Sequence, residues 1–202
     1  MKVTQEYYLA SNLILLMTPL YIVIGILVVL VLVAIVIYNG LVTSRMRVKE
    51  GWSDIEVQMK RRFDLIPNLV NTVKGSANFE TSTLEKVIQA RSAAMQGGTP
   101  AQIGKADLAL TGALGGFFAL AESYPDLKSN ANFMSLQSEL ADTENKMQAA
   151  RRFYNSVVTE YNTKIQTVPT NIFAKLFSFT EEEFFELGAD ESAAKNPVEV
   201  KF

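Results

Sequence analysis

Hydrophobic residues are distributed in two different ways along the chain. Between Leu13 and Tyr38 the sequence LILLMTPLYIVIGILVVLVLVAIVIY contains no charge and exceeds the roughly 20 residues that cross a hydrocarbon core as a helix. It differs from a secretory signal peptide because it continues into NGLVTSRMRVKE and not into a small-residue cleavage site. We therefore predict a retained transmembrane helix over residues 13–38, with Pro19 accepted near its start.

After this run, apolar residues recur with the period of an amphipathic helix. The first stripe repeats in steps of three, four or seven residues from Leu41 to Ala77. Three further helices are expected, from Ser82 to the break at QGGTP, over residues 105–123 and over residues 132–168. No stretch has a convincing period of two, so the sequence predicts an all-α protein.

Local motifs mark the boundaries of these helices. Ser82 and Glu85 have the spacing of a capping box, which predicts a helix start. The glycines and the proline of QGGTP are expected to break the chain between the second and third helices. Pro169 is expected to stop the fourth and longest helix, whose seven-residue spacing also permits a coiled coil.

The expected domain plan has four parts. Residues 1–12 form a short extracytoplasmic N-terminus and residues 13–38 the membrane helix. Residues 39–180 form a cytoplasmic helical bundle, and residues 181–202 form an acidic tail that packs back on the bundle with PVEVKF extended. The apolar segment just before the tail, from Ile172 to Phe179, is also expected to pack back on the bundle.

The charges on either side of the apolar run predict its orientation. Arg45, Arg47 and Lys49 follow it closely, whereas the N-terminal flank offers only Lys2 and the acid Glu6. By the positive-inside rule the C-terminal part lies in the cytoplasm and the N-terminus outside.

The composition excludes most catalytic chemistry. The chain has no cysteine and no histidine, which removes disulfides, thiolate nucleophiles, imidazole bases and nearly all zinc or haem ligand sets. With 19 Lys and Arg against 21 Asp and Glu, the formal net charge of −2 gives no general attraction to nucleic acid. We expect no enzyme, no catalytic residue, no cofactor, no metal and no nucleic-acid partner. The alternative is a hydrolase or phosphoryl-transfer enzyme that works through carboxylates and arginines.

Three arginines fall on the apolar faces of the predicted helices. On a helical wheel Arg62, Arg91 and Arg151 lie within the apolar stripes, whereas Arg61 faces away. A buried guanidinium needs a partner or a route to the surface, so we expect Arg62 or Arg151 to bind Glu144 between helices and set their register. The expected structural charged network comprises Arg62, Arg91, Glu144 and Arg151. An arginine site for an anionic ligand is the alternative, and an enzyme would need these groups to converge in a polar cleft.

Pro67 lies inside the first cytoplasmic stripe. A proline removes one backbone hydrogen bond and crowds the carbonyl four residues earlier, yet the stripe continues in phase through it. We therefore predict a kinked but continuous helix, with Trp52 and Phe63 as core anchors. The region FSFTEEEFF, residues 177–185, is expected to be exposed and available for contacts.

Three stretches of sequence carry a family resemblance. They are YNGLVTSRMRVKEGWSDIEVQMKRRFDLIPNLVNTVKGSANFETSTLEKVIQARSAAM, YPDLKSNANFMSLQSELADTENKMQAARRFYNSVVTEYN and the final PVEVKF. They closely resemble the LemA family of bacterial membrane proteins, with KRRFDLIPNLV as the most specific phrase. The resemblance implies one membrane helix, a short external N-terminus and a cytoplasmic, mostly antiparallel bundle of about four long helices.

The family resemblance implies little chemistry. LemA-like proteins have no established reaction whose residues could be carried over, and some relatives are associated with bacterial magnetosome membranes. The segment SANFE lacks the histidine that often precedes the glutamate in the family, so no role of that histidine applies to this chain.

The sequence therefore favours a scaffold in the bacterial cytoplasmic membrane. The expected partners are the lipid bilayer, further copies of the chain as a homo-oligomer, and other membrane proteins. Such a scaffold would shape or organise the membrane without catalysis. A transmembrane sensor is disfavoured because an external part of about a dozen residues is too small for a ligand-binding core.

Overall fold

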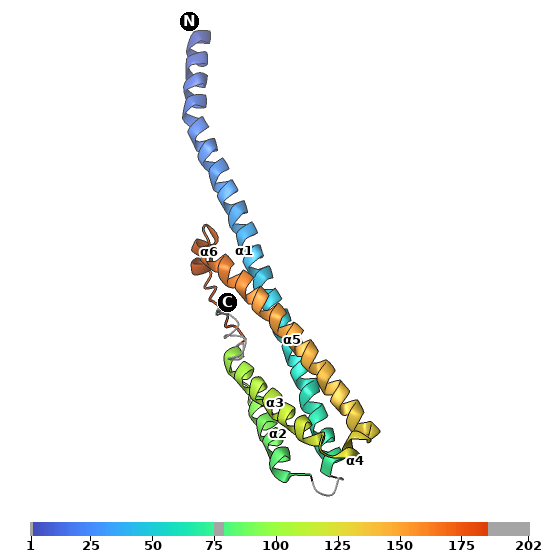
Figure 1. Ribbon diagram of the computed structural model, residues 1–202. Helices are drawn as coiled ribbons and strands as arrows, with labels where there is room; N and C mark the ends of the chain where they lie inside the picture. The colour runs from blue at the N-terminus through green and yellow to red at the C-terminus, as the bar shows by residue number, and fades with distance from the viewer. Residues whose placement is uncertain (1, 75–78, 186–202) are drawn as a thin grey trace, which may run out of the picture. The chain divides into compact units, whose positions relative to one another are not determined.

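The computed structural model describes residues 2–74 and 79–185, with side chains from Met17 onward. All regular secondary structure in these ranges is helical, which confirms the all-α class (Figure 1). The helices are α1 (Lys2–Lys74), α2 (Thr81–Ala94), α3 (Pro100–Ala121), α4 (Pro125–Lys128), α5 (Ala131–Gln166) and α6 (Thr170–Leu176).

The chain forms two compact units. The N-terminal unit comprises Met1–Ser44 and Thr163–Thr180, and the bundle unit comprises Arg45–Asn162 and Glu181–Phe202. Residues 163–180 thus associate with the apolar N-terminal helix, although the sequence pattern groups them with the bundle. Of the expected tail, residues 181–185 are described and belong to the bundle unit. Residues 186–202, including PVEVKF, lie outside the described residues.

The core of the bundle unit is formed by the apolar faces of α1, α2, α3 and α5. α2 and α3 are joined by residues 95–99 and run side by side in opposite directions (Figure 1). The stripe predicted for the first helix is buried from Ile55 to Val73, apart from Phe63, which is partly buried. The most deeply buried core residues on the four helices, all 0% exposed, are Ile55, Leu69, Val73, Val87, Leu110, Phe117, Met147, Val158 and Tyr161.

The start of α3 corrects one sequence interpretation. The helix begins at Pro100, five residues before the predicted start at Lys105. Thr99 N donates to Gln102 Oε1 at 3.0 Å, and Gln102 N donates to Thr99 Oγ1 at 3.5 Å, which is a complete capping box. The Thr-Pro pair interpreted as part of a break therefore starts the helix, because proline is favoured in the first helical turn.

The capping box predicted at Ser82 and Glu85 is wrong. The N-cap of α2 is Glu80, which has extended backbone angles of φ −63° and ψ 115° and makes no side-chain cap bond. Ser82 lies one residue inside the helix, so it cannot occupy the non-helical cap position.

The remaining boundaries agree closely with the sequence pattern. α5 starts one residue before the predicted Asn132, and Asn130 Oδ1 accepts from the backbone N–H groups of Asn132 at 2.9 Å and Phe133 at 3.2 Å. The helix ends before Pro169, as expected. α1 remains helical through Pro67 to Lys74, and the kink at Pro67 stays a prediction.

Candidate functional site

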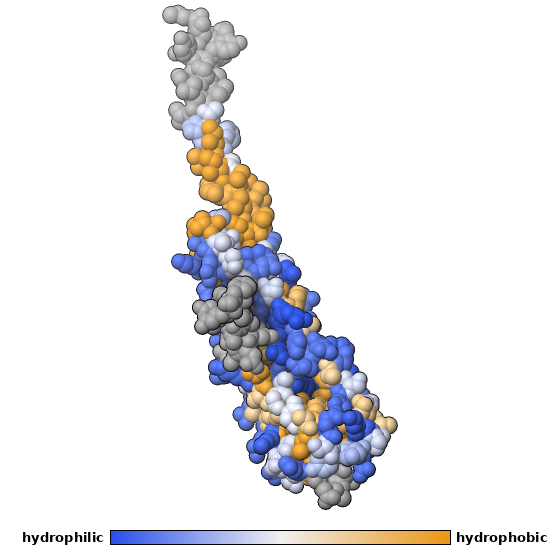
Figure 2. Space-filling model, in the orientation of Figure 1, coloured by the Kyte–Doolittle hydropathy of each residue, from blue (hydrophilic) through white to orange (hydrophobic). Residues whose placement is uncertain are grey.

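The N-terminal part of α1 presents a continuous apolar surface. Every residue from Met17 to Val33 is exposed, and Figure 2 shows most of this stretch as an orange band, with paler atoms where it begins. The most apolar window of the described helix has a mean hydropathy of 3.5 and is 0% buried. Exposed apolar area on this scale is unfavourable in water and typical of a membrane-spanning helix, so it indicates membrane anchoring.

α3 is also long and apolar enough to cross a membrane. Its most apolar window is less extreme, with a mean hydropathy of 1.3, and 33% of that window is buried. Its buried side chains include Leu110 and Phe117 in the core and the carboxylate of Asp107. We therefore interpret α3 as a core helix of the bundle unit.

A charged cluster lies inside the bundle and joins three helices. Arg62 on α1 places Nη1 2.9 Å from Asp107 Oδ1 on α3 and 2.8 Å from Glu144 Oε2 on α5. Its Nη2 donates to Thr111 Oγ1 at 3.0 Å. Arg151 on α5 places Nη2 3.3 Å from Glu144 Oε1 and 3.5 Å from Asp107 Oδ2. The charged cluster, defined as Arg62, Asp107, Glu144 and Arg151, thus pairs two cations with two carboxylates.

The charged cluster is largely shielded from solvent. The side chains of Arg62 and Asp107 are 3% and 1% exposed, and those of Arg151 and Glu144 are 12% and 20% exposed. Burial raises the pKa of the Asp107 carboxyl, the coulombic effects of Arg62 and Arg151 oppose this rise, and Glu144 adds to it. Such an arrangement leaves little access for a substrate.

The hydrogen bonding of the charged cluster is incomplete. Within the described chain, Nε of Arg62, Nε of Arg151 and Asp107 Oδ2 have no hydrogen-bond partner. Buried polar atoms without partners cost free energy, so the cluster is not arranged for maximum stability. In the same described part, no group of three or more Asp or Glu side chains gathers as a metal site.

The structure brings together three of the four residues in the predicted network and separates the fourth. Arg62, Arg151 and Glu144 meet in the charged cluster, whereas Arg91 lies apart. The sequence interpretation missed Asp107, the carboxylate that both arginines share. Its position was readable, because Asp107 falls between Ile103 and Leu110 at the spacing of the buried face of α3.

Arg91 binds a backbone carbonyl that Pro67 leaves without its helical donor. Proline has no backbone N–H, so it cannot donate to the carbonyl of Phe63 four residues earlier in α1. Arg91 Nε on α2 donates to this same carbonyl oxygen at 2.9 Å. The guanidinium therefore satisfies the acceptor that Pro67 leaves open, and it links α2 to α1 at that point.

The two proposed core anchors are only partly buried. Phe63 packs against the edge of the core cluster. Trp52 contacts Tyr154 edge to face at a centroid distance of 5.5 Å and lies 6.4 Å from the ring of Phe185. The Trp52 indole N–H donates to Glu56 Oε1 at 2.7 Å, so its polar end faces outward.

Residues 181–185 are held against α5 by side-chain hydrogen bonds to their backbone. Asn162 exchanges two bonds with the backbone of Glu182, at 2.9 and 3.0 Å. Asn155 exchanges two with the backbone of Phe185, at 3.1 and 2.9 Å. Phe185 is 0% exposed, which corrects the expectation that the whole of FSFTEEEFF is exposed.

Tyr154 completes the attachment of this segment. Its hydroxyl donates to the carbonyl oxygen of Glu183 at 2.8 Å. Burial, together with the nearby carboxylates of Glu182 and Glu183, raises the pKa of Tyr154 to about 12. The phenol therefore stays protonated near neutral pH and acts as a structural donor.

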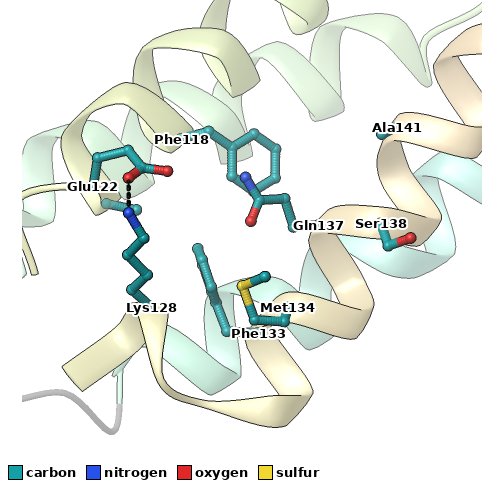
Figure 3. Close-up of a pocket in the computed structure, with 9 residues that line it drawn as sticks. Phe118, Glu122, Lys128, Phe133, Met134, Gln137, Ser138 and Ala141 are labelled. Carbon is teal, nitrogen blue, oxygen red and sulfur yellow. Dashed lines mark hydrogen bonds and ion pairs between the residues drawn. The ribbon is translucent and has the colours of Figure 1, made fainter. Parts of the chain in front are cut away.

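A surface pocket of 390 Å³ lies where α3, α4 and the start of α5 meet (Figure 3). Phe118 and Phe133 line it with rings 6.1 Å apart, and Met134 and Gln137 lie on the α5 side. Lys128 Nζ lies 2.8 Å from Glu122 Oε2, and this hydrogen bond raises the pKa of Lys128. Because the lysine stays charged and paired, it is a poor base or nucleophile.

Comparison with known proteins gives a consistent result. The sequence profile of the LemA family matches residues 51–202. Protein LemA of Metamycoplasma hominis is 30% identical over an alignment of 141 residues, which covers 68% of this chain and 63% of that protein. Magnetosome protein MamQ 2 of Paramagnetospirillum magneticum is 27% identical over 175 residues, covering 74% and 64%. Magnetosome protein MamQ of Magnetospirillum gryphiswaldense is 26% identical over 174 residues, covering 73% and 64%. The chain thus matches slightly less than two thirds of the length of these curated relatives.

Proposed function

Because the chain belongs to the LemA family, we propose that it is a non-enzymatic scaffold anchored in the bacterial cytoplasmic membrane. One helix spans the bilayer, the N-terminus lies outside, and the bundle lies in the cytoplasm. There the bundle associates with further copies or docks other membrane proteins, and so organises the membrane.

One observation carries this proposal. The uncharged stretch from Met17 to Val33 is the largest exposed apolar surface of the described chain. The residues of the charged cluster, by contrast, are mostly buried, and their positive and negative charges are paired with one another. A protein that exposes lipid-binding surface and buries its charged groups is equipped for attachment more than for catalysis. The alternative enzyme needs an open polar cleft at Arg62, Glu144 and Arg151, and these side chains are at most 20% exposed.

The orientation rests on the charges that follow the span. Arg45, Arg47 and Lys49 come soon after Tyr38, and positive residues next to a span favour the cytoplasmic side. Two of the relatives are named as magnetosome proteins, which supports a role at a membrane.

The decisive measurement is the assembly state of the full chain in native membrane. The sequence has no cysteine, so Val57→Cys gives a single fluorophore site on an exposed position of the bundle unit. Labelled protein extracted in lipid nanodiscs without detergent should bleach in several steps per particle. Met134→Cys, exposed on another helix, is the matched control for disturbance by the label.

The same Val57→Cys variant tests the orientation. A membrane-impermeant maleimide should react with it only after the cells are opened. Single bleaching steps together with no co-purifying protein contradict the scaffold, and labelling in intact cells contradicts the proposed orientation.

A further inference from the structure

The short helix α6 has an unusual end for its sequence. Ser178 adopts φ 57°, a left-handed conformation that usually requires glycine. Ser178 N donates to Lys175 O at 3.3 Å and Phe179 N donates to Ala174 O at 2.9 Å, which is a Schellman motif. The motif reverses the chain and brings Phe179 back toward α1.

This reversal fixes α6 beside the end of the apolar span. The ring of Phe177 contacts Tyr38 edge to face at a centroid distance of 4.9 Å, and Phe179 lies 6.0 Å from the same ring. Just beyond the span, Lys164 Nζ donates to Ser44 Oγ at 2.7 Å. These contacts all lie within the N-terminal unit, so α6 is held beside Tyr38, the last residue of the predicted membrane helix.

The two faces of α6 differ sharply. Ala174 is 2% exposed and faces the protein. Ile172 and Leu176, each two positions away, point about 160° from Ala174 at 100° per residue. They are 63% and 71% exposed, and Val168 just before the helix is 78% exposed. These side chains therefore do not pack back on the bundle, contrary to the sequence interpretation of this segment.

This outward face continues the apolar surface of the span. Figure 2 shows a small orange patch over α6 beside the end of the orange band on α1. Lys175, which is exposed, lies on the flank of this face and not at its centre. Apolar residues with a lysine at the edge are typical of helices that lie in a lipid interface, where the amine reaches the phosphates.

We propose that α6 is an interfacial membrane element, in which Ile172 and Leu176, with Val168, enter the lipid headgroup region at the level of Tyr38. This inference rests on the proposed membrane anchoring, because the span supplies the bilayer that α6 touches. A free helix of this length would bind lipid poorly. Because the span already holds α6 at the surface, its contact with lipid is intramolecular and needs no further loss of translational entropy. Three exposed apolar side chains are too few for a stable interface with a second copy.

The absence of native cysteine allows a direct test in the full chain. Ile172→Cys and Leu176→Cys each receive one nitroxide spin label, and the protein is placed in vesicles of phosphatidylcholine and phosphatidylglycerol. Collision rates are measured with oxygen, which concentrates in lipid, and with a water-soluble nickel complex. Val29→Cys in the span and Val57→Cys in the bundle unit, both exposed valines, are the matched references.

The proposal expects labels at Ile172 and Leu176 to favour oxygen over nickel severalfold more than the label at Val57 does. They should also lie at a shallower depth than the label at Val29. Nickel access equal to that at Val57, with Val29 in lipid, overturns the interfacial element and leaves the anchor intact. Low access to both reagents also overturns it, because the face is then covered by protein. A label at Val29 that reports water overturns the anchor itself.

Discussion

The span and the charged cluster are two solutions to the placement of side chains on helices. From Met17 to Val33 α1 carries no charge and exposes every residue, whereas inside the bundle the same helix buries Arg62 between two carboxylates. A span has one kind of neighbour on all sides, so uniform apolar composition satisfies it. A bundle helix packs against a different helix on each side, and complementary charges on two facing helices favour the correct pairing.

We therefore propose that the charged cluster fixes the register of the helices more than it stabilises the fold. Buried ion pairs often contribute less than apolar side chains of similar volume, because desolvation offsets the Coulomb attraction. However, Arg62 can meet Asp107 and Glu144 only when α1, α3 and α5 have one relative register. An apolar contact would tolerate a slip between helices, whereas a misplaced buried charge would not.

The largest effect is expected when arginines, which the bundle accommodates, are placed in the apolar span. The triple variant Ile26→Arg, Leu30→Arg and Val33→Arg should lose membrane attachment. Each arginine near the centre of a spanning helix costs about 2.5–3.5 kcal/mol, and three exceed what snorkelling can relieve. Flotation of cell membranes on a density gradient measures the attached fraction.

The control for this variant places the same three charges outside the span. Met46→Arg, Val57→Arg and Met134→Arg change exposed apolar residues of the bundle unit and should leave attachment intact. Equal flotation of both triple variants would mean that the apolar run is not the anchor.

A smaller effect is expected inside the bundle, where two adjacent arginines offer a matched pair. Arg62→Met leaves Asp107 and Glu144 with only Arg151 as a cation, and removing one partner of a buried network costs roughly 3–5 kcal/mol. Arg61→Met should change the free energy of unfolding little, because Arg61 is exposed and its partner Asp142 keeps Lys146 at 2.8 Å. Urea unfolding of the full chain in mild detergent measures both. Equal losses would show that the charged cluster has no special role.

The sequence predicts the span more completely than the cluster, for a physical reason. The anchoring helix follows from composition, which depends on no other part of the chain. The helical wheel places Arg62 and Arg151 within apolar stripes and Glu144 on the flank of one, because each placement depends on a single helix. The same construction can place Asp107 on the buried face of α3, but it cannot show that Asp107 pairs with arginines on two other helices. The sequence also missed the cap at Thr99, because glycine and proline in QGGTP are compatible with both the end of one helix and the start of the next.

The contact between Arg91 and the carbonyl of Phe63 is partly predictable from the sequence. Pro67 indicates that this carbonyl lacks its helical hydrogen bond, but it does not indicate which residue replaces it. Arg91→Met should lower the free energy of unfolding by about 1.5–3 kcal/mol, the range for a hydrogen bond to a charged group. In a Pro67→Ala background the loss should be clearly smaller, because the alanine N–H can bond to the Phe63 carbonyl within α1. Lys86→Met, an exposed cation on the same helix as Arg91, should instead be additive with Pro67→Ala. If Arg91→Met is additive as well, the guanidinium does not substitute for the hydrogen bond that the proline removes.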